Sequence, residues 1–218
     1  MEPDNPVLDD YVLALTGKDR PKVCFVPTAS GDAPDYISKF EDVLSDRAET
    51  AVLRLFTREH SDLRSFVLTQ DVIYVGGGST ANLLAVWRTH GLPEVFAEAA
   101  DNGTVLAGIS AGMNCWFEAS VTDSFGPGLA PLADGLGFLP FSNGVHHDSP
   151  RRLRAPYRRM IARGELAAGY ATEDGVGLHY VGSELAEAVT VRPAARAWHL
   201  RPNGHGGCAE QPVETRVL

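Results

Sequence analysis

Apolar runs and amphipathic segments alternate through the first half of the chain. Apolar runs of roughly four to eight residues bounded by Gly, Pro or polar residues are typical of buried strands, whereas apolar residues at every third or fourth position are typical of helices. Strands that alternate with helices predict a mostly parallel sheet with helices on both faces. The pattern predicts strands at 22–28, 50–56, 71–75 and 104–109, and helices at 34–46, 61–68, 80–90 and 93–100.

The second half of the chain has a different pattern. A helical run is predicted over 111–118, and the Gly-, Pro- and Ser-rich segment 119–145 is typical of a loop. A helix is predicted at 151–165, and short apolar runs within 167–200 predict an antiparallel extension. We expect the tail from Arg201 onward to be loosely packed.

The composition is that of a soluble globular chain. Of the 218 residues, 44% are hydrophobic and 22% are charged, and this length supports one domain with its own core. We therefore expect a single α/β domain over residues 1–218, with a core at about 20–200 and a tail at 201–218. The formal net charge of −9 argues against nucleic acid as the main partner.

Neither a targeting segment nor a membrane span is expected. The N-terminus MEPDNPVLDD is acidic and lacks the apolar core of a signal peptide, and no run approaches the roughly 18 apolar residues that cross a bilayer. The three cysteines, Cys24, Cys115 and Cys208, fit neither a disulfide framework nor a zinc site. These features predict a cytoplasmic protein.

A serine stands between glycines at the end of the predicted strand 104–109. Gly108-Ile109-Ser110-Ala111-Gly112 fits the G-x-S-x-G pattern of a nucleophile elbow, a sharp strand-to-helix turn that exposes the serine hydroxyl and tolerates only small neighbours. The backbone N–H of Ala111 then opens the next helix and is a candidate oxyanion donor. A turn that merely needs small residues is the alternative interpretation.

A serine nucleophile needs a base, and the base needs an orienting carboxylate. Of the seven histidines, the adjacent pair His146 and His147 follows an apolar approach into a loop, although plain solvation of such a pair is an alternative. Asp123 lies between the serine and this pair in the chain and is the favoured carboxylate. Glu118 and Asp134 are the weaker candidates.

A second glycine-rich turn, Gly76-Gly77-Gly78-Ser79, follows the predicted strand 71–75. It lacks the lysine of a P-loop and the spacing of a dinucleotide-binding turn, which argues against a nucleotide. Ligands of parallel α/β sheets bind at the carboxyl ends of the strands, where both glycine turns are expected. Exposed N–H groups of this turn are candidates for a second oxyanion donor.

Five segments, spread over about residues 22–180, carry a joint pattern: FVPTASGD (25–32), YVGGGSTANLLAVWR (74–88), GISAGMNCWFE (108–118), TDS (122–124) and HHDS (146–149). Together they resemble the peptidase E family of serine peptidases, which includes aspartyl dipeptidases and the related cyanophycinases. The resemblance implies an α/β three-layer sandwich with a mostly parallel sheet, similar to class I glutamine amidotransferases and flavodoxin-like, with serine in place of the amidotransferase cysteine.

The resemblance also implies the roles of individual residues. Ser110 would be the nucleophile and His146 the base, with His147 in place of an aromatic residue of the family; the choice between the two histidines stays open. Backbone N–H groups would form the oxyanion hole, namely those of Gly77, Gly78 and Ala111.

The orienting carboxylate is the least constrained member of the implied triad. Asp123 is the first candidate. The third member varies between aspartate and glutamate in such enzymes, so Glu118 and Glu173 (in TEDG) stay open as alternatives.

The best-known members of the family cleave dipeptides with an N-terminal aspartate, whose carboxylate needs a cation. Arg151, Arg152 and Arg154 follow the histidine loop and are candidates for it, because arginine suits a bidentate carboxylate contact. A solvated helix face is the alternative interpretation of these arginines. Ser79 stands where some relatives carry asparagine and is the fourth expected substrate-binding residue.

These observations predict a serine exopeptidase that hydrolyses short peptides by a Ser-His-Asp/Glu mechanism, without a metal or an organic cofactor. The expected partner is a small peptide substrate, and a homodimer stays open. The alternatives are a hydrolase of the same fold that acts on another amide, isopeptide or ester, and a non-catalytic binding protein that has kept the elbow.

Overall fold

The computed structural model describes residues 5–149 and 154–218 and divides into two compact units. The units are Met1–Met113 and Asn114–Leu218. The boundary between them falls before the last residue of the short helix α6 (Ala111–Asn114), which follows Ser110. In the described part of the chain, no helix is long and apolar enough to cross a bilayer.

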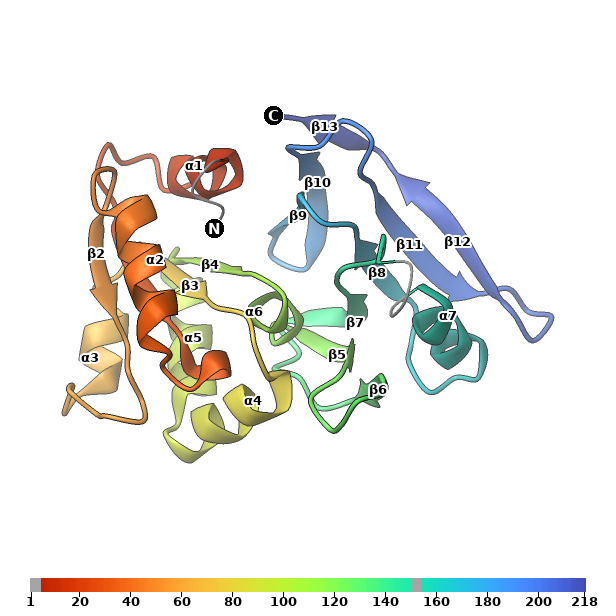
Figure 1. Cartoon of the computed structure of the whole chain (residues 1–218), viewed down its shortest axis with the longest axis horizontal. Helices are drawn as coiled ribbons and strands as arrows, with labels where there is room; N and C mark the ends of the chain where they lie inside the picture. The colour runs from red at the N-terminus through yellow and green to blue at the C-terminus, as the bar shows by residue number, and fades with distance from the viewer. Residues whose placement is uncertain (1–4, 150–153) are drawn as a thin grey trace. The chain divides into compact units, whose positions relative to one another are not determined.

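The first unit is built on a four-stranded sheet with the strand order β2-β1-β3-β4 (Figure 1). All three pairings are parallel, so the carboxyl ends of β3 and β4 lie side by side, with Val75 paired to Gly108. This confirms the predicted parallel sheet. The strands are β1 (Lys22–Val26), β2 (Glu49–Val52), β3 (Val72–Val75) and β4 (Val105–Gly108).

Helices cover both faces of this sheet, as the alternating pattern predicts. Phe25 and Tyr74 point to one face and form a core with the side chains of α1 and α2, including Phe40. The intervening strand residues point to the opposite face, where α5 contacts β4 and packs against α3 and α4. The helices are α1 (Val7–Ala14), η1 (Thr28–Ser30), α2 (Pro34–Leu44), α3 (Leu63–Val67), α4 (Thr80–Thr89) and α5 (Leu92–Asp101).

Two sequence predictions about residues 111–145 are wrong. The helical run ends at Asn114 instead of 118, and the expected loop contains three strands: β5 (Phe117–Thr122), β6 (Ala130–Leu132) and β7 (Leu139–Gly144). Most of β5 is buried, small polar residues such as Ser120 included, so it lacks the apolar-polar alternation that marks a half-exposed strand.

The second unit contains a six-stranded sheet with the order β12-β11-β8-β7-β5-β6 and a three-stranded sheet with the order β13-β10-β9. The neighbours β5, β7 and β8 run parallel, whereas β8–β11, β11–β12 and β9–β10 are antiparallel, which confirms the predicted antiparallel extension. The remaining elements are α7 (Arg154–Ala162), β8 (Gly169–Thr172), β9 (Val176–Val181), β10 (Glu184–Thr190), β11 (Ala197–Pro202), β12 (Cys208–Val213) and β13 (Thr215–Val217).

The segment after Arg201 is not a loosely packed tail. β12 pairs with the whole of β11, from Ala197 opposite Val213 to Pro202 opposite Cys208, and β13 pairs with β10. These strands carry many polar residues, so the sequence shows no apolar pattern that would predict them. A hairpin at the edge of a sheet needs few apolar side chains when a neighbouring strand satisfies its backbone hydrogen bonds.

Candidate active site

Ser110 occupies a sharp turn between β4 and α6. Its φ is +56°, a left-handed conformation that costs a residue with a side chain roughly 1–2 kcal/mol. Among the described residues, the other non-glycine positions with positive φ are Asp32 and His146. The Asp32 carboxylate accepts the N–H groups of two loop residues, which gives that case a structural explanation. Strained residues of this kind are concentrated at functional sites.

The glycines beside Ser110 are required by close backbone contacts. A Cβ on Gly108 would lie 1.9 Å from the carbonyl oxygen of Gly112, and a Cβ on Gly112 would lie 2.2 Å from that of Val75. The turn therefore accepts no side chain at either position, which agrees with the steric reason for the G-x-S-x-G pattern.

The second glycine turn lies against the serine, as expected from the neighbouring carboxyl ends of β3 and β4. A Cβ on Gly77 would be 3.3 Å from the Cβ of Ser110, and Gly78 has φ +141° and approaches the carbonyl of Ala29 too closely for any side chain. Ser79 caps α4, because its hydroxyl accepts the N–H of Asn82 at 3.3 Å.

The N–H of Gly77, an expected oxyanion donor, has an acceptor within the first unit. It donates to the hydroxyl of Tyr36 at 3.1 Å. Burial raises the pKa of Tyr36, although the Gly77 N–H acts in the opposite direction, so the phenol stays protonated at neutral pH. The backbone N–H groups of Gly78 and Ala111 are the other two expected donors.

His146 lies in the second unit, just after β7, and also has φ +56°. Its Nδ1 lies 2.5 Å from Oδ1 of Asp174, which lies on the turn between β8 and β9. The side chains are 44% and 56% exposed, so this contact lies at the surface of the second unit. β7 and β8 are parallel neighbours, with Gly144 opposite Ala171, so their carboxyl ends bring the two residues together.

The carboxylate at His146 Nδ1 is therefore Asp174, where the sequence analysis favours Asp123. Asp123 is exposed in the turn after β5. Because β5 also pairs in parallel with β7, Asp123 lies at the same edge of the sheet as His146. Glu118 is exposed on β5, and Asp134 is exposed after β6. Asp174 follows β8, and β8 is the parallel neighbour of the strand β7 that precedes His146. The spacing of residues in the sequence does not reveal that these two strands pair.

Glu173, the alternative candidate in the same turn, supports the neighbouring strand. Its Oε2 accepts the N–H of Arg196 at 2.9 Å, and its Oε1 accepts the indole N–H of Trp198 at 3.0 Å. The two carboxylate oxygens thus bind β11 and the residue directly before it, Arg196, to the turn between β8 and β9. These bonds restrain the backbone next to Asp174.

His147 has an environment unlike that of His146. Its side chain is buried, with Nε2 hydrogen-bonded to Glu210, and burial lowers its pKa against the opposing effect of that carboxylate. Burial alone would raise the pKa of Glu210, but the bonds from His147 and Arg154 outweigh it and lower the pKa. A neutral, buried His147 that donates to Glu210 fits a structural role.

Arg154 is held by the same cluster. Its Nη2 donates to Oε2 of Glu210 at 2.9 Å, and its guanidinium lies 4.8 Å from the centre of the Trp198 ring. These contacts occupy the side chain that the sequence analysis assigns to substrate binding. The other two expected arginines, Arg151 and Arg152, lie outside the described residues.

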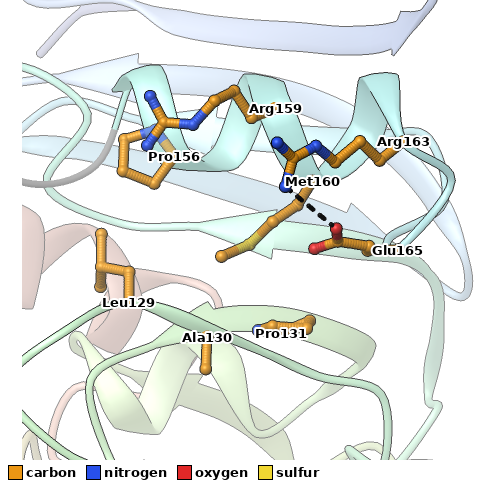
Figure 2. A pocket seen from close by; sticks show the side chains of 8 residues that line it. All are labelled: Leu129, Ala130, Pro131, Pro156, Arg159, Met160, Arg163 and Glu165. Carbon is orange, nitrogen blue, oxygen red and sulfur yellow. Dashed lines mark ion pairs between the residues drawn. The ribbon is translucent and has the colours of Figure 1, made fainter.

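A surface groove of about 350 Å³ lies in the second unit between α7 and the segment around β6 (Figure 2). Arg159 of α7 and Arg163, in the turn directly after α7, line the groove, and Arg163 forms an ion pair with Glu165 at 3.6 Å. In the described part of the chain, none of the expected site residues lines this groove, so it carries no part of the predicted chemistry. Its lining consists of Leu129, Ala130, Pro131, Pro156, Arg159, Met160, Arg163 and Glu165.

A metal site is also absent from the described residues. Within 5–149 and 154–218, no group of three His, Cys, Asp or Glu side chains could hold a metal ion. The first unit offers a hydroxyl on a strained turn beside backbone N–H groups. The second unit, taken by itself, offers an imidazole with a carboxylate on one nitrogen. These are the kinds of group that nucleophilic acyl transfer uses.

Comparisons with known proteins show the family of the chain. The family model for peptidase family S51 matches residues 1–188. The chain is 44% identical to the uncharacterized peptidase YgaJ of Bacillus subtilis, over all of this chain and 94% of that protein, and 32% identical to peptidase E of Haemophilus influenzae, over 80% and 82%. The crystal structure of a peptidase from an acI-B1 actinobacterium has the same fold, with a TM-score of 0.71 at 18% identity over 96% of this chain and 89% of that one. The chain therefore belongs to peptidase family S51.

Proposed function

We propose that the chain is a serine exopeptidase that hydrolyses short peptides, including dipeptides with an N-terminal aspartate. The observation that carries the proposal is Ser110, held at positive φ between two glycines that tolerate no Cβ. A strained backbone that presents a hydroxyl at the carboxyl end of a parallel strand has a ready explanation in nucleophilic catalysis.

In the proposed mechanism, Oγ of Ser110 attacks the carbonyl carbon of the scissile bond while Nε2 of His146 accepts the hydroxyl proton. The imidazolium then gives that proton to the leaving amine, and the C–N bond breaks to leave an ester on Ser110. Water, activated by the same imidazole, hydrolyses the ester and restores both side chains. The mechanism requires the imidazole of His146 to reach the hydroxyl of Ser110, and each residue is supported by the geometry of its own unit.

Asp174 is the proposed orienting carboxylate. Its bond to Nδ1 of His146 favours the tautomer with a proton on Nδ1 and leaves Nε2 to act as the base. A carboxylate in this place also stabilises the imidazolium that forms during attack. Asp123 is the second candidate because its strand ends at the same sheet edge.

The oxyanion is proposed to bind the N–H groups of Ala111 and Gly78. Ala111 opens the helix that follows the nucleophile, and Gly78 lies in the turn packed beside Ser110. The N–H of Gly77 already donates to Tyr36, so we assign Gly77 the task of letting the turn approach the serine.

The preference for aspartate is supported by the resemblance to aspartyl dipeptidases and by relatives named peptidase E. A substrate carboxylate needs a cation, and Arg154 is engaged by Glu210 and Trp198. Arg151 and Arg152 are therefore the proposed contacts for the aspartate side chain.

Aspartyl p-nitroanilide is expected to be hydrolysed faster than leucyl or alanyl p-nitroanilide by the wild-type protein. The expected preference is about tenfold or more in kcat/KM, because one satisfied charged contact contributes roughly 1.5–3 kcal/mol. Release of p-nitroaniline measures all three. Faster turnover of another amide, isopeptide or ester would replace the substrate class and keep the mechanism, and no turnover of any substrate would favour a binding protein.

Asp174→Ala is expected to lower kcat about 10²–10⁴-fold with a much smaller change in KM, since the carboxylate acts on the base and not on substrate binding. Asp123→Ala is the matched variant from the same sheet edge and is expected to change kcat less than about tenfold. Steady-state kinetics on the best substrate compare the two. A larger loss in Asp123→Ala would assign the orienting role to Asp123 instead.

A further inference from the structure

Asp174 lies on a short, exposed turn, yet its carboxylate must keep one direction to serve His146. The turn joins β8 to β9. The side chain of Asp174 is 56% exposed, so packing by neighbouring residues restricts the orientation of its carboxylate little. An exposed aspartate samples several rotamers unless its backbone and its hydrogen-bond partner are both fixed. The contacts that fix the backbone of Asp174 therefore bear on the base.

Two charged side chains clamp the backbone of Asp174 from both sides. Oδ1 of Asp148 accepts the Asp174 N–H at 3.0 Å, and Nη1 of Arg192 donates to the Asp174 carbonyl at 3.0 Å. The same Nη1 donates to Oδ2 of Asp148 at 3.2 Å, which closes the clamp. Asp148 lies two residues after His146, in the HHDS segment, so it ties the loop of the base to the turn of the carboxylate.

The end of β10 anchors the clamp. The stem of Arg192 lies where a Cβ of Gly175 would be, 2.8 Å from Cδ, and the N–H of Val191 donates to the Gly175 carbonyl at 3.0 Å. The hydroxyl of Thr190 is hydrogen-bonded to both sides of this junction, to the carbonyls of Gly175 and Arg192. The guanidinium thus comes from a bend directly after β10, and the backbone of this bend is hydrogen-bonded to the turn that contains Gly175.

We infer that the Asp148–Arg192 pair is a positioning device that holds the Asp174 carboxylate on Nδ1 of His146. The effect of this pair on the reaction rests on the proposed function, whereas its effect on the imidazole of His146 rests on the structure alone. The ion pair of Arg192 with Oδ2 of Asp148 at 3.2 Å also holds in place the carboxylate whose other oxygen accepts the Asp174 N–H.

The first test reads the tautomer of His146 without any substrate. The protein is labelled with ¹⁵N-histidine, and His146→Gln assigns the His146 signals. At a pH where the imidazole is neutral, wild type is expected to carry the proton mainly on Nδ1. Asp148→Ala and Arg192→Gln are expected to move the population toward the Nε2–H form, in the same direction as Asp174→Ala.

The second test measures kcat and KM for the same variants on the best substrate. Asp148→Ala and Arg192→Gln are expected to lower kcat about tenfold or more with KM nearly unchanged, because a misplaced base slows the chemical step. Arg192→Lys is expected to recover most of kcat, since both hydrogen bonds of Arg192 come from a single nitrogen that an ammonium can replace.

Glu187→Gln and Arg216→Gln are the matched controls. Arg216 donates to Glu187 at 2.9 Å in the same three-stranded sheet, and its side chain is 55% exposed against 56% for Arg192. These variants are expected to leave the tautomer and kcat unchanged. An unchanged His146 tautomer in both clamp variants would overturn the inference, whatever the activity. If the tautomer shifts in the clamp variants but the wild-type protein hydrolyses no peptide, the positioning role of the Asp148–Arg192 pair stands and the proposed function is rejected.

Discussion

Ser110→Ala is expected to lower kcat/KM for the best peptide substrate by at least about 10⁴-fold, with the melting temperature unchanged. Removal of a catalytic nucleophile leaves only the rate enhancement from substrate binding and the oxyanion hole. Serine and alanine bear the same strain at φ +56°, so the exchange costs little stability. Steady-state kinetics and calorimetry measure both quantities.

Ser110→Gly separates the catalytic role of this residue from its conformation. Glycine adopts positive φ freely, so this variant is expected to be as inactive as Ser110→Ala but more stable by up to about 1 kcal/mol. Ser65→Ala, at an exposed serine of α3, is the control and is expected to retain full activity. Activity of Ser110→Ala above about a tenth of wild type would remove Ser110 from the nucleophile role.

Gly108→Ala is expected to lower the free energy of unfolding by about 3 kcal/mol or more and to abolish activity. The new Cβ would lie 1.9 Å from the carbonyl oxygen of Gly112, so the backbone of the elbow must move. The hydroxyl of Ser110, two residues on, moves with it. Calorimetry of the variant, together with its kcat/KM, measures the two effects.

Two other glycines calibrate this result. A Cβ on Gly128 meets open space at an ordinary φ, so Gly128→Ala is expected to change stability by less than about 0.5 kcal/mol. Gly91 also faces open space but has φ +65°, so Gly91→Ala is expected to cost about 1 kcal/mol from strain alone. A cost for Gly108→Ala no larger than that of Gly91→Ala would mean that the elbow is not sterically closed.

The sequence predicts the first unit well because its signals are local. The buried strand 72–75 is a short continuous apolar run, and a glycine turn and the helix α4 follow it. The tightness of the G-x-S-x-G turn follows from the same reasoning, because steric exclusion at Gly108 and Gly112 involves neighbours in the chain and the adjacent parallel strand.

The second unit is less predictable because its strands depend on distant partners. Buried polar residues in β5 and edge strands such as β12 carry little hydrophobic periodicity, and their hydrogen bonds come from segments far along the chain. The placement of Asp174 beside His146 is of this kind: 28 residues separate them, and only the parallel pairing of β7 with β8 joins their ends. The chain order serine, aspartate, histidine pointed to Asp123 instead.

Labelling with a fluorophosphonate tests the central claim, that Ser110 is an activated nucleophile, most directly. Intact wild-type protein is expected to gain the mass of one adduct, and peptide mapping is expected to locate it on Ser110. Ser110→Ala is expected to remain unlabelled, and Asp174→Ala to label more slowly because its base is less well oriented. Equal labelling of wild type and Ser110→Ala, or an adduct on a different residue, would contradict the account.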